Sequence, residues 1–224
     1  MALSQVGFGL KPINKVGSNY NAAQVSEYIG FNGGYNLAFQ MPVKVATGTG
    51  ASTQVRPQYT EGDRITGSFI GVSYEDRNTG KPVFADHVTS NDLIINRFNY
   101  ETDTASYFVT DDPYQLYLMK ISADMTVSAM NGNYYPNYAG GLPGVTTTAD
   151  GKRSIVKLDT ESNATFNSTA VFKFMHVGSS VDDKEFSSTG TYSQSNSDIL
   201  NAGSNVVVMI NKHRYNAGTF GGTG

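Results

Sequence analysis

Short runs of apolar and β-branched residues, separated by turn residues, recur along most of this chain. Runs of this kind, bounded by Gly, Asn, Asp and Pro, are typical of β-strands. No stretch sustains the 3.6-residue period of a long amphipathic helix or a heptad repeat. The pattern predicts an all-β protein with a barrel-like or sandwich β-domain, and with strands at residues 41–46, 65–74, 106–110, 114–121, 153–159, 169–178 and 205–215.

The run at 65–74 is apolar on both of its faces, and glycine interrupts one of them. On a regular strand, one face would carry Ile65, Gly67, Phe69 and Gly71, and the other Ile70, Val72 and Tyr74. Glycine inside a strand marks a bend or the close approach of another segment, so the run predicts a barrel strand. The turn-rich segment 75–82 that follows predicts a hairpin leading into a second apolar strand.

The first 35 residues show no sustained period of either kind, and we expect them to form an extended N-terminal arm. Within them, Asn21–Phe31 is also compatible with a short helix closed by the following glycines. Residues 36–224 are then the β-domain, with a second boundary conceivable in the Gly- and Tyr-rich stretch 131–151. The strands after that stretch either complete a barrel begun at 36–130 or form a second sheet.

The composition narrows the class of protein. The chain carries 24 Gly and 14 Tyr with only 16% charged residues, a mixture that suits many short strands and turns. The net charge is −3 and no segment clusters Lys and Arg, so we expect no binding to nucleic acid. There is no apolar run long enough to span a membrane and no signal-peptide pattern, so we expect synthesis in the cytoplasm. Without Cys, disulfides and thiolate metal sites are excluded.

Candidate catalytic or metal-binding residues are few. The three histidines, His87, His176 and His213, lie far apart in the sequence and in none of the paired spacings of a metal site. We expect His176 to be a hydrogen-bonded strand residue, and His87 and its neighbour Asp86 to point to opposite faces and form no dyad. We therefore expect no enzymatic activity, no cofactor and no metal.

Two pairs of neighbouring carboxylates, Asp111–Asp112 and Asp182–Asp183, are further candidates. Neither pair follows the alternating acceptors, central Gly and terminal Glu of a calcium loop. Asp111 and Asp112 precede Pro113 directly after a strand run, which is strong turn chemistry. We interpret this pair as part of a turn.

Three segments resemble a known family in the same order along the chain. They are ITGSFIGVSYEDRNTGKPVFADHV at 65–88, SYFVTDDPYQLYLMKISADM at 106–125, and NAGSNVVVMINKHRYNAGTFGGTG at 201–224. Together with the N-terminal MALSQVGFGLKPINKVGSNYN, they are similar to virion structural proteins of tailed bacteriophages of the capsid decoration or cement type. The resemblance implies a non-enzymatic protein on the outer surface of the virion capsid, made in the cytoplasm of the bacterial host.

This resemblance implies that the partner is the phage major capsid protein, and that the chain assembles as a homo-oligomer, either a trimer or a dimer. Aromatic and apolar residues in segments without strand period are the expected capsid contacts: Phe8, Ile13, Tyr20, Tyr134, Tyr135 and Tyr138. The alternative for these residues is that they pack onto their own β-domain. Alternative functions are a tail or head-fibre component that binds a host glycan, and a hydrolase or isomerase on a β scaffold.

Overall fold

The computed structural model describes residues 6–17, 23–31, 35–47, 53–57, 64–89, 104–126, 132–137, 147–160, 170–178, 186–187 and 199–216. Within these ranges the chain is made of β-strands, and the single helical element is the short 3-10 helix η5 (Arg214–Asn216). The predicted all-β class is thereby confirmed. No helix in the described part of the chain is long and apolar enough to cross a membrane.

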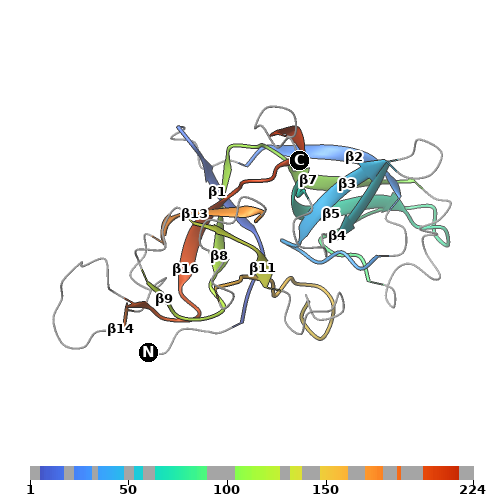
Figure 1. The fold of residues 1–224 in the computed structure, drawn as a ribbon. Coiled ribbons are helices and arrows are strands. Elements are labelled where there is room, and N and C mark those ends of the chain that lie inside the picture. The colour runs from blue at the N-terminus through green and yellow to red at the C-terminus, as the bar shows by residue number, and fades with distance from the viewer. Residues whose placement is uncertain are drawn as a thin grey trace.

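A closed five-stranded barrel forms one half of the molecule, at the right of Figure 1. Its strands are β2 (Val25–Phe31), β3 (Pro42–Thr47), β4 (Thr53–Pro57), β5 (Gly67–Glu75) and β7 (Ala105–Thr110). They pair in the order β3-β4-β2-β7-β5, and a further pairing of β5 with β3 closes the ring. Strand β6 (Pro82–Ala85) extends the sheet beyond β5 as the second arm of the predicted hairpin. The barrel encloses a core of Leu37, Ala38, Met41, Val43, Val45, Val55, Phe69, Val72, Tyr74, Val88, Ala105, Tyr107 and Val109.

Glycine and a bulge let β5 curve around this core. A Cβ at Gly67 would overlap the carbonyl oxygen of Thr110 on β7, so only glycine permits this approach of the two strands. A bulge between Phe69 and Gly71 then shifts the register against β7. Because the bulge inserts one residue, Phe69 and Val72 both face the core. The prediction of a barrel strand is confirmed, but the assignment of these two residues to opposite faces was wrong.

The second unit, at the left of Figure 1, is built on an antiparallel five-stranded sheet. Its order is β1 (Lys11–Lys15), β8 (Gln115–Lys120), β16 (Asn205–Ile210), β13 (Phe172–Val177) and β10 (Asn133–Tyr134). Two small sheets flank it: β11 (Pro136–Asn137) with β12 (Lys157–Leu158), and β14 (Phe186–Ser187) with β15 (Ile199–Leu200) and β9 (Met125–Thr126).

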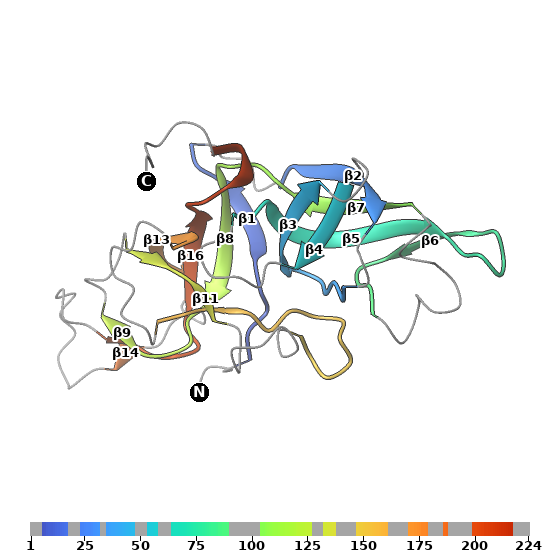
Figure 2. The same cartoon turned by 45° about the vertical axis from the view of Figure 1, so that its right-hand side comes forward.

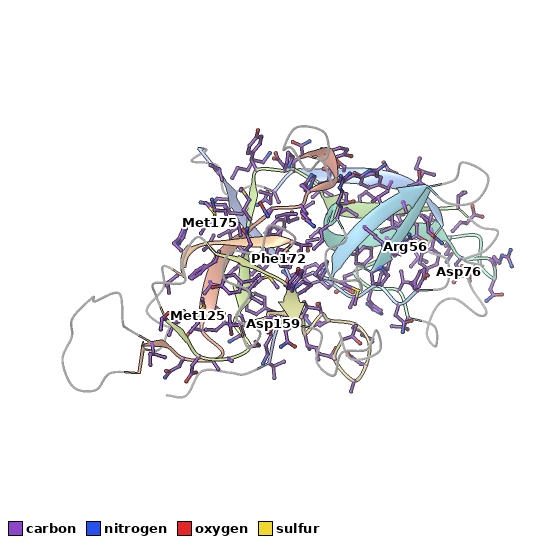
Figure 3. All side chains as sticks on the ribbon, in the orientation of Figure 1. Arg56, Asp76, Met125, Asp159, Phe172 and Met175 are labelled. Atoms are coloured by element: carbon purple, nitrogen blue, oxygen red, sulfur yellow. The ribbon has the colours of Figure 1, made fainter. Side chains whose placement is uncertain are left out.

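The second unit has its own core. It consists of Leu10, Ile65, Tyr117, Met119, Ile121, Met125, Tyr134, Val156, Leu158, Val171, Phe172, Phe174, Leu200, Val206, Val208 and Ile210. Side chains such as Phe172 and Met125 fill the space beside these strands in Figure 3. Between β7 and β8, the turn 111–114 takes the chain from the barrel core to the second core.

The N-terminal residues are extended, as predicted, but they are integral to both units. Strand β1 pairs with β8 in the second unit, and β2 pairs with β7 along its length in the barrel. The alternative of a helix at Asn21–Phe31 was wrong, because a period of two prevails there: Val25, Glu27 and Ile29 are exposed, whereas Ser26 and Tyr28 are half-buried. The described part of the arm is therefore structural, not a free tail.

The two units lie side by side in both ribbon views and are joined by hydrogen bonds (Figures 1 and 2). The N–H of Leu10 donates to the carbonyl of Gln40 at 2.8 Å, and the Ser68 hydroxyl donates to the carbonyl of Leu10 at 2.7 Å. The residue Ile65, just before β5, reaches from the barrel into the second core, and its N–H donates to the carbonyl of Lys212 after β16 at 3.0 Å. Segments from the start, middle and end of the chain thus hold the units together.

Candidate functional site

The outer surface of the barrel carries large apolar side chains that its own core does not use. On β2, the alternation that buries one face leaves Val25 46% exposed and Ile29 65% exposed. On β6, Phe84 is 67% exposed. Exposed large apolar residues that lie together are more informative than scattered ones, because they mark surfaces that a partner covers.

Strand register places two of these residues in one row across four strands. Ile29 on β2 lies opposite Ser106 on β7, Ser106 lies opposite Ser73 on β5, and Ser73 lies opposite Phe84 on β6. Directly opposed residues on a sheet share a face, so the four side chains point outward together. The row has a large apolar side chain at each end and two small hydroxyl side chains between them.

The adjacent row supports the Phe84 ring. Phe108 on β7 lies opposite Gly71 on β5, and the rings of Phe84 and Phe108 are 5.5 Å apart in a tilted arrangement. A Cβ at Gly71 would come within 3.1 Å of the Phe84 ring, so the absence of a side chain leaves room for the ring beside the strand. Here "the barrel face" denotes Val25, Glu27, Ile29, Phe84 and Phe108. It is an apolar surface with one carboxylate, Glu27, opposite Phe108.

A second concentration of polar side chains, the junction cluster, lies where the two units meet. It consists of Ser26, Tyr28, Asp111, His213 and Tyr215. The Asp111 carboxylate is 6% exposed and accepts hydrogen bonds from Ser26 Oγ at 2.6 Å, from the Tyr28 hydroxyl at 2.5 Å and from the Tyr215 hydroxyl at 3.3 Å. Burial and the bond to Asp111 raise the pKa of Tyr28, so its phenol keeps its proton. The buried Asp111 carboxylate thus binds three hydroxyl donors.

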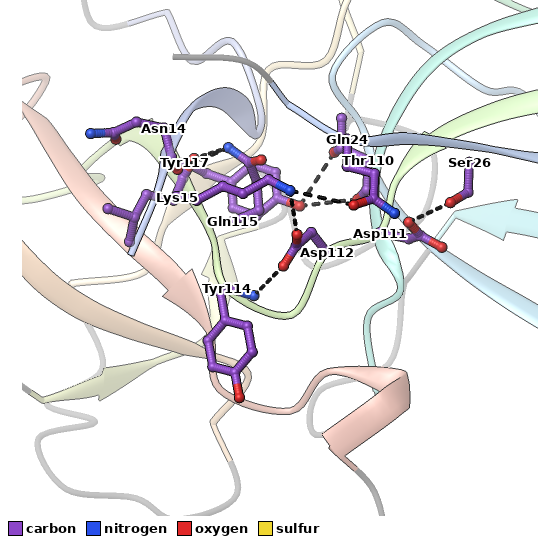
Figure 4. A network of polar contacts seen from close by, with 11 residues as sticks. Asn14, Lys15, Gln24, Ser26, Thr110, Asp111, Asp112, Tyr114, Gln115 and Tyr117 are labelled. Atoms are coloured by element: carbon purple, nitrogen blue, oxygen red, sulfur yellow. Dashed lines mark hydrogen bonds and ion pairs between the residues drawn. The ribbon is translucent and has the colours of Figure 1, made fainter. Parts of the chain in front are cut away.

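The neighbouring Asp112 ties the turn to β1 (Figure 4). One oxygen forms an ion pair with Lys15 Nζ at 2.5 Å, and the other accepts the Tyr114 N–H at 2.8 Å. Burial alone would raise the pKa of Asp112, but the contacts with Lys15 and Tyr114 outweigh it and hold the pKa below its ordinary value. The interpretation of Asp111–Asp112 as turn residues is confirmed, and both have structural partners.

The same close-up shows how β7 and β8 are tied together beyond the turn (Figure 4). The hydroxyl of Tyr117 is buried and donates to the carbonyl oxygen of Thr110 at 3.0 Å. The side-chain amide of Gln115 donates to the carbonyl oxygen of Asn14 on β1 at 3.0 Å. The contacts of β8 with β7 and with β1 therefore hold the turn between the two units in place.

The three histidines have separate surroundings in the structure. His176 is exposed and its Nδ1 lies 2.9 Å from the carbonyl oxygen of Val177, in keeping with the prediction of a hydrogen-bonded strand residue. His87 contacts Asp86 at 2.6 Å, contrary to our expectation, because both lie past the end of β6 where the strand pleat no longer separates neighbours. Across the described ranges, no three His, Cys, Asp or Glu side chains are grouped to hold a metal.

The predicted contact residues that the structure describes are buried or half-buried. Tyr134 is only 3% exposed and packs edge-on against Phe174, with ring centroids 6.4 Å apart, so its prediction as a capsid contact is corrected. The reason is that β10 pairs with β13 and turns Tyr134 into the core. Phe8, Ile13 and Tyr135 are half-buried. Tyr20 and Tyr138 lie outside the described residues.

Sequence reasoning missed the barrel face. The signal was present in the period-two pattern of Val25, Glu27 and Ile29, which a helical reading of that segment obscures. Phe84 was assigned to a strand after the hairpin, but its outward direction depends on its pairing with Ser73. No sequence pattern aligns residues 29 and 84, since three strand pairings set their common row.

Comparison of the chain with protein-family models, with curated proteins and with solved structures finds no match in any of the three. The barrel face and the junction cluster are therefore the features from which a function is inferred.

Proposed function

We propose that this chain is a structural virion protein that decorates a bacteriophage capsid and binds the lattice of the major capsid protein through the barrel face. The observation that carries the proposal is the outward row ending in Ile29 and Phe84, both about two-thirds exposed. The resemblance of residues 65–88, 106–125 and 201–224 to capsid decoration proteins supports the choice of partner. In this function the protein contributes surface complementarity and no chemical step.

The exposed area is large enough to matter for binding. Full burial of a Val, Ile or Phe side chain contributes about 1.5–3 kcal/mol relative to leaving it in water. Val25, Ile29 and Phe84 are 46%, 65% and 67% exposed, so covering all three contributes roughly 3–5 kcal/mol. Each 1.4 kcal/mol is tenfold in affinity, so covering these three side chains accounts for roughly two to three and a half orders of magnitude in affinity.

The carboxylate within the barrel face adds specificity. Glu27 is exposed and lies opposite Phe108, inside the apolar surface. A partner that covered it without a hydrogen-bond donor would leave a desolvated charge, which costs several kcal/mol. The complementary surface on the shell is therefore expected to be apolar with a donor or a basic side chain opposite Glu27.

Co-sedimentation with empty heads of the phage that encodes the chain tests the proposal. The double variant I29S/F84S should bind the heads about 25-fold to several hundredfold more weakly, since covering these two side chains contributes roughly 2–4 kcal/mol. The matched control is Val16→Ser, which removes a 48% exposed apolar side chain just after β1 in the second unit. Both variants should melt close to the wild-type temperature, because the replaced side chains lie outside the two cores.

Three outcomes separate the hypotheses. Equal binding by wild type and I29S/F84S would show that the barrel face is not the contact. Failure of the wild type to sediment with heads at any concentration would refute capsid decoration itself. Retention on the host surface polysaccharide instead of on heads would favour the adhesion alternative.

A further inference from the structure

The C-terminal segment leaves the second unit and docks on the barrel. Strand β16 ends at Ile210, after which His213 forms a parallel bridge with Ile65 just before β5. The N–H of Arg214 donates to the carbonyl of Ile65 at 3.0 Å. Helix η5 then carries Tyr215 to Tyr28 on β2, where the two hydroxyls are 2.8 Å apart. The segment 213–216 thus closes the junction between the two units from outside.

His213 is buried at this contact between the two units, and its hydrogen bonding requires one protonation form. Its side chain is 1% exposed, and Nδ1 accepts the backbone N–H of Tyr215 at 3.2 Å. An imidazole nitrogen that accepts a hydrogen bond carries no proton, so the proton resides on Nε2 and the ring is neutral. Nε2 is itself buried and makes no hydrogen bond among the described residues. The docked segment is therefore built around the neutral imidazole.

The groups that face His213 act on it in opposite directions. Burial is the largest influence and lowers its pKa. The backbone of Thr66 and the carboxylates of Asp111 and Asp112, on the turn between the units, raise the pKa, and Arg214 on its own segment lowers it further. Lys15 from β1 engages Asp112, while the phenols of Tyr28 and Tyr215 engage Asp111, so both nearby carboxylates are already occupied. The net effect is a lowered pKa for His213.

We propose that His213 is a pH-sensitive latch, and that its protonation releases residues 213–216 from the barrel. A proton taken from solvent binds Nδ1, which then turns from an acceptor into a donor and faces the Tyr215 N–H as a second donor. The hydrogen bond that anchors η5 is lost, and Tyr215 withdraws from Tyr28 and Asp111. The bonds of Asp111 to Ser26 and Tyr28 connect strands within the barrel and stay in place.

The direction of the pH dependence follows from linkage. An undocked His213 has the ordinary value of about 6.5, whereas the docked residue binds its proton less readily. The segment is therefore fully docked above about pH 6.5, and acidification below this value favours the open form. In that window the equilibrium constant for opening rises by up to about tenfold per pH unit, and it levels off once the docked residue also protonates.

Hydrogen exchange read by mass spectrometry tests the latch. We expect the protection factor of the peptide covering 213–216 to fall between pH 7.5 and pH 5, by up to about tenfold per pH unit below pH 6.5, while the β16 peptide keeps its protection. His213→Asn places a non-titrating oxygen where Nδ1 lies, so it should retain the docked segment at both pH values. His176→Asn, at an exposed histidine, should keep the wild-type pH dependence.

Nuclear magnetic resonance of the imidazoles gives an independent readout, since the chain has three histidines. The resonance lost in His213→Asn should titrate below 6.5. If His213→Asn does not fold, Tyr215→Phe provides the second variant: it removes only the hydroxyl contacts, so the segment should open more at every pH with an unchanged pH dependence. The latch is refuted by wild-type protection that is equal at both pH values, or by a pH dependence that persists in His213→Asn.

Discussion

The Asp111 carboxylate provides the sharpest test of how the two units are held together. Replacing it with alanine removes the acceptor for Ser26, Tyr28 and Tyr215 at once. These donors come from β2 and from the C-terminal helix η5. The change therefore weakens contacts within the barrel and the contact between the two units. The neighbouring Asp112 offers a matched control, because it is the same residue type on the same turn.

The magnitude follows from the burial of the three donors. A hydrogen bond to a charged group contributes about 1.5–3 kcal/mol. Tyr215 is 55% exposed and can bond to water, whereas Ser26 and Tyr28 are half-buried and lose their partner outright. Two such hydrogen bonds are lost, and the loss is offset in part because the buried carboxylate no longer has to be desolvated. Asp111→Ala should therefore lower the free energy of unfolding by about 3 kcal/mol. For a chain of 224 residues this corresponds to a fall in melting temperature of roughly 6–12 °C.

The control should be clearly milder. Asp112→Ala loses the ion pair with Lys15 and the bond from the Tyr114 N–H, together about 1 kcal/mol and roughly 2–4 °C. Differential scanning calorimetry at pH 7.5 measures both variants against wild type. Equal shifts for Asp111→Ala and Asp112→Ala would refute the reasoning, because they would mean that the three hydroxyl bonds at the junction contribute nothing beyond a surface turn.

Three further predictions concern packing and pH. Gly67→Ala should destabilise the barrel severely, since the added Cβ overlaps the Thr110 carbonyl; urea unfolding measures this, and a loss below about 1 kcal/mol would contradict the close approach. Tyr134→Ala should cost about 3–5 kcal/mol in the same assay, whereas Tyr135→Ala should cost much less; comparable losses would place both residues in the core. Because the pKa of Asp112 is lowered, its ion pair with Lys15 stabilises the fold above about pH 4, and this stabilisation is lost as the carboxylate protonates. The free energies of unfolding of wild type and Lys15→Met, measured in urea, should therefore converge below that pH. A difference that stays constant with pH would show that the ion pair does not cause it.

The local pattern of the sequence was enough to locate most of the long strands. The runs at 41–46, 65–74, 106–110 and 114–121 match β3, β5, β7 and β8 to within two residues at each end. Strand β13 begins three residues inside the run at 169–178, and β16 stops at Ile210 within the run at 205–215. The hairpin after β5 also followed from local chemistry, since Asp76 Oδ1 accepts the N–H of Asn78 at 2.8 Å within the turn. Such features depend on neighbours in the chain, which a single sequence displays.

Tertiary structure decided which face of each strand is buried and which residues share a surface. Phe69 and Val72 reach the same core because a bulge forms against β7, and Tyr134 is buried because β10 pairs with β13. Ile29 and Phe84 share a row through pairings that span residues 29 to 106, and no local period encodes that register. Side-chain direction alternates at every residue, so a single-residue shift in a long-range pairing reverses what is inside and what faces a partner.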